Sequence, residues 1–410
     1  MSLATRVGVA LAAMTGASQF HRAALGVVAP ELAADLDLGP AALGAANTAF
    51  FGALMVAQIP VGVMLDRIGP RRLVLWLTGL AVLGAVAQAL AQDGTQFLAA
   101  RFVLGLGCGA SFMAAVFLSG RWHKGPGLTR ALSSIFAWSN AGILAAGAPL
   151  AVMTGWLGWR GAFLLSAGLT LMIGVLWARF AADDPPGAPP RIAPRDSLAQ
   201  VLAGQVTVWA TPGLPRILAL HGFAYAAMAT LLALWAGPYL FDVHGLDAGL
   251  RGTVLLAMGL AVPAGQLAVP PLERLLGRER AVLASAGTVV ATLLLLALWP
   301  ALPLAAAVAL LMLCCFFSAY SILLVTQGRA LFPEHLVGRG VTTVNLAQVL
   351  GSALLPALVG WAVGWVGAGE AGYRAGFALM ALCLLGGMAG YRWLPRPSST
   401  TGTHSTSSRE

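Results

Sequence analysis

The chain has 410 residues, of which 59% are hydrophobic and 10% are charged, and its mean hydropathy is +0.83. A soluble domain is about 25% charged, and a single soluble core stops growing near ~250–300 residues, so this composition excludes an ordinary soluble enzyme. The formal net charge of +9 is scattered along the chain, which excludes the contiguous basic patch of a nucleic-acid-binding protein.

Apolar runs of about the ~20 residues that a helix needs to cross a bilayer follow one another along the chain. The twelve runs are 7–30, 41–64, 73–92, 97–119, 131–153, 161–181, 216–240, 250–270, 281–299, 301–327, 341–366 and 374–393. The ninth and tenth runs are separated only by a short segment with two prolines, Pro300 and Pro303. The runs predict an all-α membrane protein with twelve transmembrane helices.

The longest polar stretch lies between the sixth and seventh runs and divides the chain into two halves. We expect an N-terminal six-helix bundle at 1–182, a cytoplasmic linker at 183–213 and a C-terminal six-helix bundle at 214–395. Within the linker, Leu198 to Trp209 is either a short interfacial helix or a plain loop. The Ser/Thr-rich segment 396–410 is expected to be a disordered cytoplasmic tail.

The arginines predict how the chain crosses the membrane, because basic residues gather in cytoplasmic loops. With the N-terminus inside, most of the 24 basic residues fall in such loops, and Arg160, Arg251 and Arg374 fall outside. We therefore expect a multi-pass protein of a bacterial-type cytoplasmic (inner) membrane, with both termini in the cytoplasm and no cleaved signal peptide.

An internal repeat supports the division into halves. Asp66-Arg67-Ile68-Gly69 follows the second run, and Glu273-Arg274-Leu275-Leu276-Gly277 follows the eighth, with the two acids 207 residues apart. Pro149 and Pro356, in the fifth and eleventh runs, are separated by the same interval. The two six-helix bundles are therefore expected to be pseudo-symmetric.

The loop after the second run carries the most specific motif, Gly62 to Arg72, in which a Gly precedes Asp-Arg and a second Gly precedes a basic pair. It resembles the signature of the major facilitator superfamily between its second and third spans. The resemblance covers about residues 1–395 and implies two bundles around a central cavity that opens alternately to each side. It also implies that these loops control closure of the cytoplasmic face. The expected gating residues are Gly62, Asp66, Arg67, Gly69, Arg71, Arg72, Glu273 and Arg274.

Arg101 opens a second motif, Arg101 to Gly109, which resembles the Arg-xxx-Gly-xxx-Gly pattern of the superfamily's fourth span. The resemblance implies a role for Arg101 in coupling transport to protons. The alternative is an arginine that extends to the outer headgroups.

The fifth run departs from the Gly-Pro pattern of the family's proton antiporters, because Ala148 precedes Pro149 and no Gly pair follows. It also lacks the Gly/Asn-rich signature of the family's nitrate branch. The first difference weighs against a proton antiporter, and the second weighs against a nitrate transporter.

Arg22 is the most informative charge, because it lies two-thirds along the first run with no acid in the same run. An arginine at this depth costs at least ~2.5 kcal/mol on insertion scales and needs an anionic partner or a wet cavity. We interpret it as the contact for an anionic substrate, as in anion-importing branches of the superfamily. A structural bond to a carbonyl is the alternative. Ser18 and Gln19, about one turn earlier, are expected to share the lining.

His21 and His221 are the best candidates for a proton carrier, because none of the 15 acids lies near the middle of a run. Hydrogen-bonded packing is the alternative for both. Further polar residues at membrane depth are expected either to line the cavity or to bind neighbouring helices. They are Tyr225, Trp138, Asn140, Tyr320, Asn345 and Gln348.

These features predict a secondary transporter of a small organic anion, a carboxylate or a phosphate ester, that is taken up with protons. The first alternative is a proton-coupled efflux antiporter for drugs or metabolites, and the second is a receptor or assembly factor that does not transport. No enzyme activity, metal or cofactor is expected, because the chain has no P-loop and its four cysteines lack metal-site spacing. We expect a monomer whose partners are its substrate, protons and lipid.

Overall fold

The computed structural model describes residues 2–123, 126–187, 206–332, 337–367 and 369–395, and every regular element among them is a helix. The first half contains α1 (Leu3–Leu36), α2 (Pro40–Ile68), α3 (Pro70–Leu90), α4 (Gly94–Cys108), α5 (Ser111–Trp122), α6 (Pro126–Ala145) and α7 (Ala148–Phe180). The second half begins with α9 (Leu214–Thr230), η1 (Leu231–Trp235), α10 (Ala236–Asp242), α11 (Ala248–Leu276) and α12 (Arg278–Leu298). It continues with α13 (Leu304–Phe317), η2 (Ser318–Tyr320), α14 (Ser321–Ala330), α15 (Val337–Val366) and α16 (Glu370–Trp393). The all-α prediction is confirmed.

Within the described residues, 10 helical ranges are long and apolar enough to cross a membrane. One of them, Ser134–Phe180, contains Gly158, whose φ of 68° and ψ of 170° interrupt the helix, so this range holds two of the predicted runs. The 34-residue α1 is not among the 10, because Gln19, His21 and Arg22 lower its hydropathy. The predicted break between the ninth and tenth runs is confirmed, since α12 ends at Leu298 and α13 begins at Leu304.

Four of the predicted runs are interrupted where the sequence alone predicts continuous helices. The fourth run divides into α4 and α5 around Gly109, and the fifth divides into α6 and α7 just before Pro149. Proline lacks an amide hydrogen and is tolerated in the first turn of a helix but not in its interior. The seventh run contains the π-helical turn η1, and the tenth contains the 3₁₀ turn η2. Such turns mark local departures from regular packing.

The internal repeat is visible in the backbone. Gly69 and Gly277 end α2 and α11 with φ values of 89° and 76°, in the region that favours glycine. A Cβ added at Gly142 would overlap the carbonyl oxygen of Gly16, and one added at Gly351 would overlap that of Gly222. In each half, the first and fifth spans therefore meet backbone to backbone, as small residues permit.

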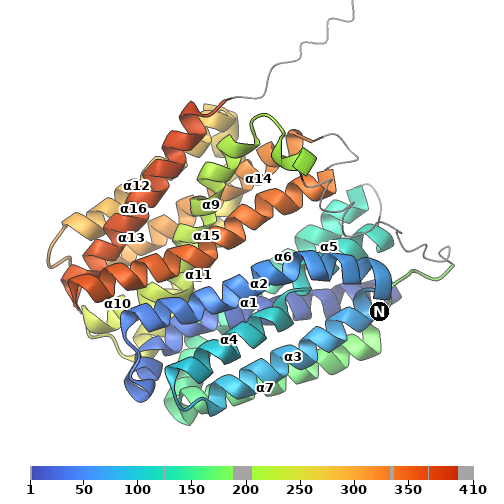
Figure 1. Cartoon of the computed structure of the whole chain (residues 1–410), viewed down its shortest axis with the longest axis horizontal. Coiled ribbons are helices and arrows are strands. Elements are labelled where there is room, and N and C mark those ends of the chain that lie inside the picture. Colours follow the sequence, from blue (N-terminus) through green and yellow to red (C-terminus); the bar gives the residue numbers. More distant parts are fainter. Residues whose placement is uncertain (1, 124–125, 188–205, 333–336, 368, 396–410) are drawn as a thin grey trace, which may run out of the picture.

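The two sets of helices converge at one end of the molecule and spread apart toward the other (Figure 1). We call the end with the connections 37–39, 91–93 and 243–247 the distal end, and the end where α1 begins and α16 ends the terminal end. Near the distal end, a Cβ at Gly44 of α2 would lie against Pro356 of α15. Toward the terminal end α2 and α15 diverge in Figure 1.

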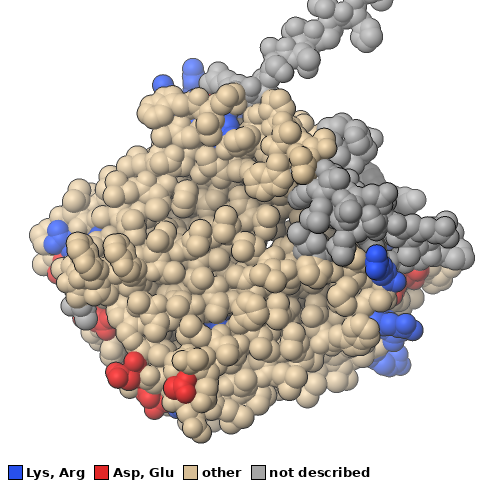
Figure 2. Space-filling view, viewed as in Figure 1, with Lys and Arg blue, Asp and Glu red and all other residues tan. Residues whose placement is uncertain are grey.

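The surface of the molecule has the charge distribution of a membrane protein. On the face in Figure 2, acidic atoms gather at the lower left and basic atoms at the right and top, with an almost uncharged surface between them. Large apolar side chains are widely exposed, among them Trp76, Leu267, Trp365 and Trp393, which are 61–80% exposed. Such a surface is stable in contact with lipid rather than with water.

Candidate functional site

Arg101 is buried inside the first half and fully bonded to two neighbouring helices. From α4, it donates to the carbonyl oxygens of His21 (3.1 Å) and Ala46 (3.4 Å) and to Oδ1 of Asn47 (3.4 Å). Its guanidinium also lies over the ring of Phe50, 4.6 Å from the centroid. Its side chain is 0% exposed, so it does not extend to the headgroups, and that alternative is wrong.

Arg22 lies one residue along α1 from His21 and has a different environment. Its guanidinium carbon is 6.0 Å from the centroid of the Phe51 ring, and the thiol of Cys108 lies close to both Arg22 and Ser18. Its Nε is buried without a hydrogen-bond partner. Among the described residues, no carboxylate or carbonyl bonds to this guanidinium, so a positive charge lies half-buried and unpaired by them inside the first half.

His21 points away from this charge, toward α7. Its Nε2 lies 3.0 Å from Oγ1 of Thr170, which itself donates to the carbonyl of Ser166, and its Nδ1 is buried without a partner. The second histidine, His221 of α9, is 0% exposed, and both of its ring nitrogens lack partners within the part of the chain that the structure describes. The role of both residues in proton transfer stays a prediction.

The remaining predicted lining residues are distributed over both halves. The side chains of Gln19, Asn140, Tyr225, Asn345 and Gln348 are half-buried. Ser18 is buried beside the thiol of Cys108, and the hydroxyl of Tyr320, which is 1% exposed, has no hydrogen-bond partner among the described residues. Trp138 is 72% exposed. The structure thus places these side chains on helices of both halves, and their contact with substrate stays a prediction.

A cavity of about 1240 Å³ opens in the first half, between α1, α5, α6 and α7. Its walls are mostly apolar, and Ser166 and Thr170 contribute hydroxyl groups. Trp138 lines it, whereas Arg22 and Gln19 do not. The predicted substrate residues are therefore not gathered in this cavity.

The predicted gating residues at the terminal end make contacts within their own halves. Arg71 donates from its side chain to the carbonyl of Ala178 (2.8 Å), in the last turn of α7, and from its backbone to Asp183 (2.7 Å), three residues after that helix ends. Glu273 pairs with Arg278 at 2.5 Å. A Cβ added at Gly62 would lie 3.5 Å from Met113, and Gly69 ends α2. The side chains of Arg67, Arg72 and Arg274 are exposed. The side chain of Asp66 lies outside the described residues.

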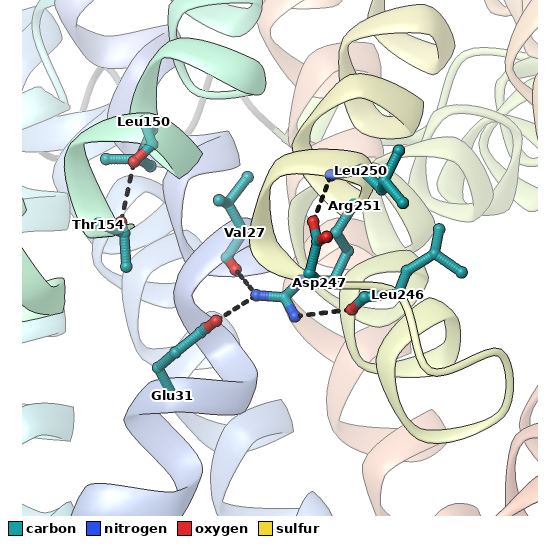
Figure 3. Close-up of polar contacts among 8 residues, drawn as sticks. All are labelled: Val27, Glu31, Leu150, Thr154, Leu246, Asp247, Leu250 and Arg251. Carbon is teal, nitrogen blue, oxygen red and sulfur yellow. Dashed lines mark hydrogen bonds and ion pairs between the residues drawn. The ribbon is translucent and has the colours of Figure 1, made fainter. Parts of the chain in front are cut away.

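An ion pair that the sequence does not predict joins the two halves at the distal end. From α11, Arg251 donates to Oε1 of Glu31 (2.5 Å) and to the carbonyl of Val27 (3.0 Å), both on α1 (Figure 3). It also donates to the carbonyl of Leu246 (3.5 Å). In the sequence, Glu31 directly follows the first apolar run and Arg251 lies at the start of the eighth. The two are 220 residues apart, and nothing in the sequence pairs them.

Further close contacts join the two halves toward the distal end. A Cβ at Gly26 of α1 would meet the carbonyl of Leu232 at 2.9 Å, and one at Gly237 of α10 would overlap the carbonyl of Gly26. Thr48 of α2 donates to the carbonyl of Ala353 on α15. The distal ends of the two halves are therefore closed against each other.

A family model described as the Major Facilitator Superfamily matches residues 11–329 of the chain. Among known proteins, the chain is 28% identical over 181 residues to a probable galactarate/D-glucarate transporter of Escherichia coli (strain K12), covering 42% of this chain and 39% of that protein. It is 29% identical over 154 residues to a 4-hydroxybenzoate transporter of Pseudomonas aeruginosa, covering 38% and 34%. It is 27% identical over 161 residues to a nitrate/nitrite transporter of Nostoc punctiforme, covering 37% and 32%. The matched stretches therefore span about two fifths or less of these relatives.

Solved structures resemble the chain over nearly its whole length. A bacterial homologue of the human lysosomal transporter Spinster, in an inward-facing and occupied conformation, has a TM-score of 0.77 at 14% identity and covers 96% of this chain and 97% of its own. A D-xylose-proton symporter has a TM-score of 0.74 at 14% identity and covers 97% and 99%. At this identity the likeness shows the fold.

Proposed function

The chain belongs to the Major Facilitator Superfamily, and from this premise we propose that it is a secondary transporter that moves a small organic anion by alternating access. The observation that supports an anionic substrate is that Arg22 lacks a hydrogen-bonding partner in the part of the chain that the structure describes. Its charge lies within the predicted first span, and its Nε is buried without a partner among the described residues. Arginines in membrane-spanning segments normally pair with an acid or with backbone carbonyls. A carboxylate or phosphate ester of the substrate would supply the missing partner, held by charge-assisted hydrogen bonds.

The other buried arginines support this assignment by contrast. Arg101 bonds to two carbonyls and an amide, and Arg251 bonds to a carboxylate and two carbonyls. Arg216, at the terminal end of α9, pairs with Glu279 and lies over the ring of Tyr391. The fold thus provides partners for three buried arginines and none from the described residues for Arg22, as expected for a residue whose partner arrives from solution.

The names of the relatives favour the same substrate class. Galactarate, D-glucarate and 4-hydroxybenzoate, in the names of two of them, are carboxylates. We propose Gln19, Ser18, Tyr225, Asn140, Asn345 and Gln348 as the polar groups that orient such an anion, with Tyr320 and Trp138 as further lining residues. Nitrate, in the name of a third relative, belongs in a substrate screen, although the chain lacks the nitrate branch's signature in its fifth span.

We further propose uptake driven by protons, across a bacterial-type inner membrane that the protein spans as a monomer with both termini in the cytoplasm. In this orientation the closed distal end faces outward, and the terminal end faces the cytoplasm. His21 and His221 are the proposed proton carriers, and Arg101 positions the turn of α1 that carries His21. The terminal loops, with Asp66 and Glu273, are proposed to close when the distal end opens.

Efflux is a second candidate, favoured by a 29% identity over 168 residues with a quinolone resistance transporter of Acinetobacter baumannii. The absence of the antiporter pattern around Pro149 weighs against it. A receptor or assembly factor that does not transport is the third candidate, and counterflow of any solute would exclude it.

The test is a thermal-shift screen of the purified protein against sugar acids, aromatic acids, phosphate esters, nitrate and quinolones, followed by uptake of each hit into vesicles. We expect stabilisation by a carboxylate or phosphate ester. We also expect the added ligand to accumulate inside vesicles whose interior is more alkaline than the outside. Stabilisation by quinolones alone, with export under the same gradient, would overturn the proposal.

A further inference from the structure

The cavity between α1, α5, α6 and α7 is a groove that faces away from the second half, and we call it the lateral groove. On α6 it is lined by Ala141 and Ala145. The same helix meets α11 at Ile143, which would lie 3.4 Å from a Cβ added at Gly259. Ile143 is two residues from both alanines and therefore about 200° around the helix from them. A molecule in the lateral groove thus lies outside the space between the two halves.

The lateral groove is open on a side of the molecule that faces lipid. Val9 of α1, Trp138 of α6 and Leu169 of α7 line it, and they are 45–72% exposed. Trp138 and Leu169 belong to an apolar range, Ser134–Phe180, that is long enough to cross a membrane. Exposed apolar side chains in such a range are in contact with acyl chains rather than with water. Membrane lipids therefore have direct access to the groove.

The dimensions of the lateral groove suit the acyl chains of one leaflet. It follows α1 from Val9 to Phe20, a length of about 16 Å at the helical rise per residue. This length is close to half of a hydrocarbon core of ~30 Å. The volume of about 1240 Å³ exceeds the ~300–1,000 Å³ of a typical small-molecule site. The groove thus has room for a lipid tail rather than only for a small solute.

Water is a poor occupant of the deep part of the lateral groove. A buried water needs about 2–4 polar partners, and the walls are mostly apolar. The hydroxyls of Ser166 and Thr170, which line the groove, already donate to the carbonyls of Phe163 and Ser166 on their own helix. Acyl chains fill such a space at a lower cost than water does.

Further polar groups lie where the lateral groove reaches the terminal end. Ser119, in the last turn of α5, lines the groove and is 1% exposed, and its hydroxyl has no hydrogen-bond partner among the described residues. One turn later His123 also lines the groove. On α1, Arg6 is exposed beside the lining residue Thr5. A hydroxyl below a basic mouth has the order of groups that complements an ester carbonyl below a phosphate.

We propose that the lateral groove binds a phospholipid with an acidic headgroup, from the leaflet on the terminal side. Its acyl chains lie along α1 between Val9 and Phe20, and an ester carbonyl accepts a hydrogen bond from Ser119. The negative headgroup lies at Arg6 and His123, since basic groups at a membrane surface attract anionic lipids. The bound lipid supports α6 on the side opposite α11. It is not transported, and its site does not involve Arg22.

The first experiment locates the lipid on the unaltered protein. The full chain is reconstituted in phosphatidylcholine vesicles that contain a small share of phosphatidylglycerol with a photoactivatable acyl chain, and the crosslinked peptides are identified by mass spectrometry. We expect the crosslinks to concentrate on the groove sides of α1 and α6. Unlabelled phosphatidylglycerol should reduce them more than the same amount of phosphatidylcholine does. Crosslinks spread evenly over the exposed faces, including that of Trp76 on α3, would overturn the proposal.

The second experiment fills the lateral groove. Gly8 lines it, and an added Cβ there meets nothing within 4 Å, so Gly8→Phe places a ring in the space of the lipid. The matched control is Gly168→Phe on α7, at an exposed glycine outside the groove with equally open surroundings. Native mass spectrometry measures the dissociation constant of phosphatidylglycerol, and we expect it to rise about tenfold in Gly8→Phe alone. Equal affinity of Gly8→Phe and the wild type would overturn the site.

The third experiment tests the headgroup. Arg6→Gln should reduce the preference for phosphatidylglycerol over phosphatidylcholine about fivefold, the effect of one basic residue near an anionic surface. Arg67→Gln, which removes another exposed arginine, should leave the preference unchanged. A wild type that binds both lipids equally, or an Arg6→Gln variant with an unaltered preference, would overturn the acidic headgroup. No transported anion is present in these measurements, so the lipid site stands even if the proposed function fails.

Discussion

Arg101 donates to the main-chain carbonyl of His21 at 3.1 Å, so α4 fixes the turn of α1 that carries Arg22 on another face. The bond uses the backbone of His21 rather than its ring, which leaves the ring free to bind Thr170. One buried arginine therefore holds the position of a second arginine whose own charge is unpaired. This division is what a binding site requires, because a contact residue must be positioned by groups that are themselves fixed.

Replacing Arg101 by Gln should reduce stability more than it changes ligand specificity. The substitution removes three hydrogen bonds from a fully buried cation, and we expect a loss of about 2–4 kcal/mol, seen as a lower thermal midpoint in detergent. Arg67→Gln, at an exposed position, is the control and should change stability by no more than about 0.5 kcal/mol. Equal midpoints for the two variants would refute a structural role for Arg101.

Enlarging Gly237 should hold the distal end open. A Cβ at this position overlaps the carbonyl oxygen of Gly26, so Gly237→Ala separates α10 from α1 in the closed state without touching Arg22. In a Cys383→Ala background, labels on cysteines introduced at Ala34 of α1 and Leu250 of α11, two exposed positions at the distal end, should then lie farther apart than in the protein with Gly237. The control is Gly8→Ala on α1, where an added Cβ meets nothing within 4 Å. If the Gly237→Ala variant keeps the same label distance as the protein with Gly237, α1 and α10 accommodate the added methyl group and the prediction is wrong.

Removing the hydrogen-bond partner of His21 separates its two candidate roles. If His21 carries the proton, His21→Gln should abolish pH-driven accumulation of the identified substrate and preserve its counterflow. Thr170→Val should shift the pH profile of uptake, because it removes the bond at Nε2. Loss of counterflow and of thermal stability together, with no separate effect on accumulation, would assign His21 to packing.

The ion pair between Asp35 and Arg160 should stabilise the protein only above acidic pH. The hydrogen bond from Arg160 lowers the pKa of Asp35 below its ordinary value of 3.8. A lowered folded-state pKa contributes stability above the ordinary pKa, and this contribution is lost as the pH falls through the folded value. Asp35→Asn should thus lower the thermal midpoint slightly at pH 7 and not at the most acidic pH that the protein tolerates. Asp37→Asn, at an exposed position, is the control.

The sequence predicts the membrane fold well because spans depend on composition over about twenty residues. The runs, their break near Pro300 and the repeat with Gly69 and Gly277 all follow from local patterns. The interruptions at Gly109 and η1 do not, because they depend on how neighbouring helices pack. Pro149 does give a local signal for its break, since proline is poorly tolerated inside a helix, but only the structure shows that the chain stops there instead of kinking.

The candidate site is predictable to a different extent. Arg22 is identified by its depth in an apolar run, and that depends on sequence alone. The partners of Arg101 and His21, and the bond of Glu31 to Arg251, join residues 54–220 positions apart. No periodicity or spacing in one sequence reveals such pairs. The charges can be found in the sequence, but which of them is left unpaired is a property of the fold.

The most direct test of the central claim is the affinity of Arg22→Gln for the best anionic ligand of the substrate screen, measured beside Arg22→Lys and the wild type. Loss of a charge-assisted hydrogen bond predicts a dissociation constant raised about 10- to 150-fold in Arg22→Gln, with partial recovery in Arg22→Lys and an unchanged thermal midpoint without ligand. Unchanged affinity in a folded Arg22→Gln protein would contradict the assignment of Arg22 as the anion contact.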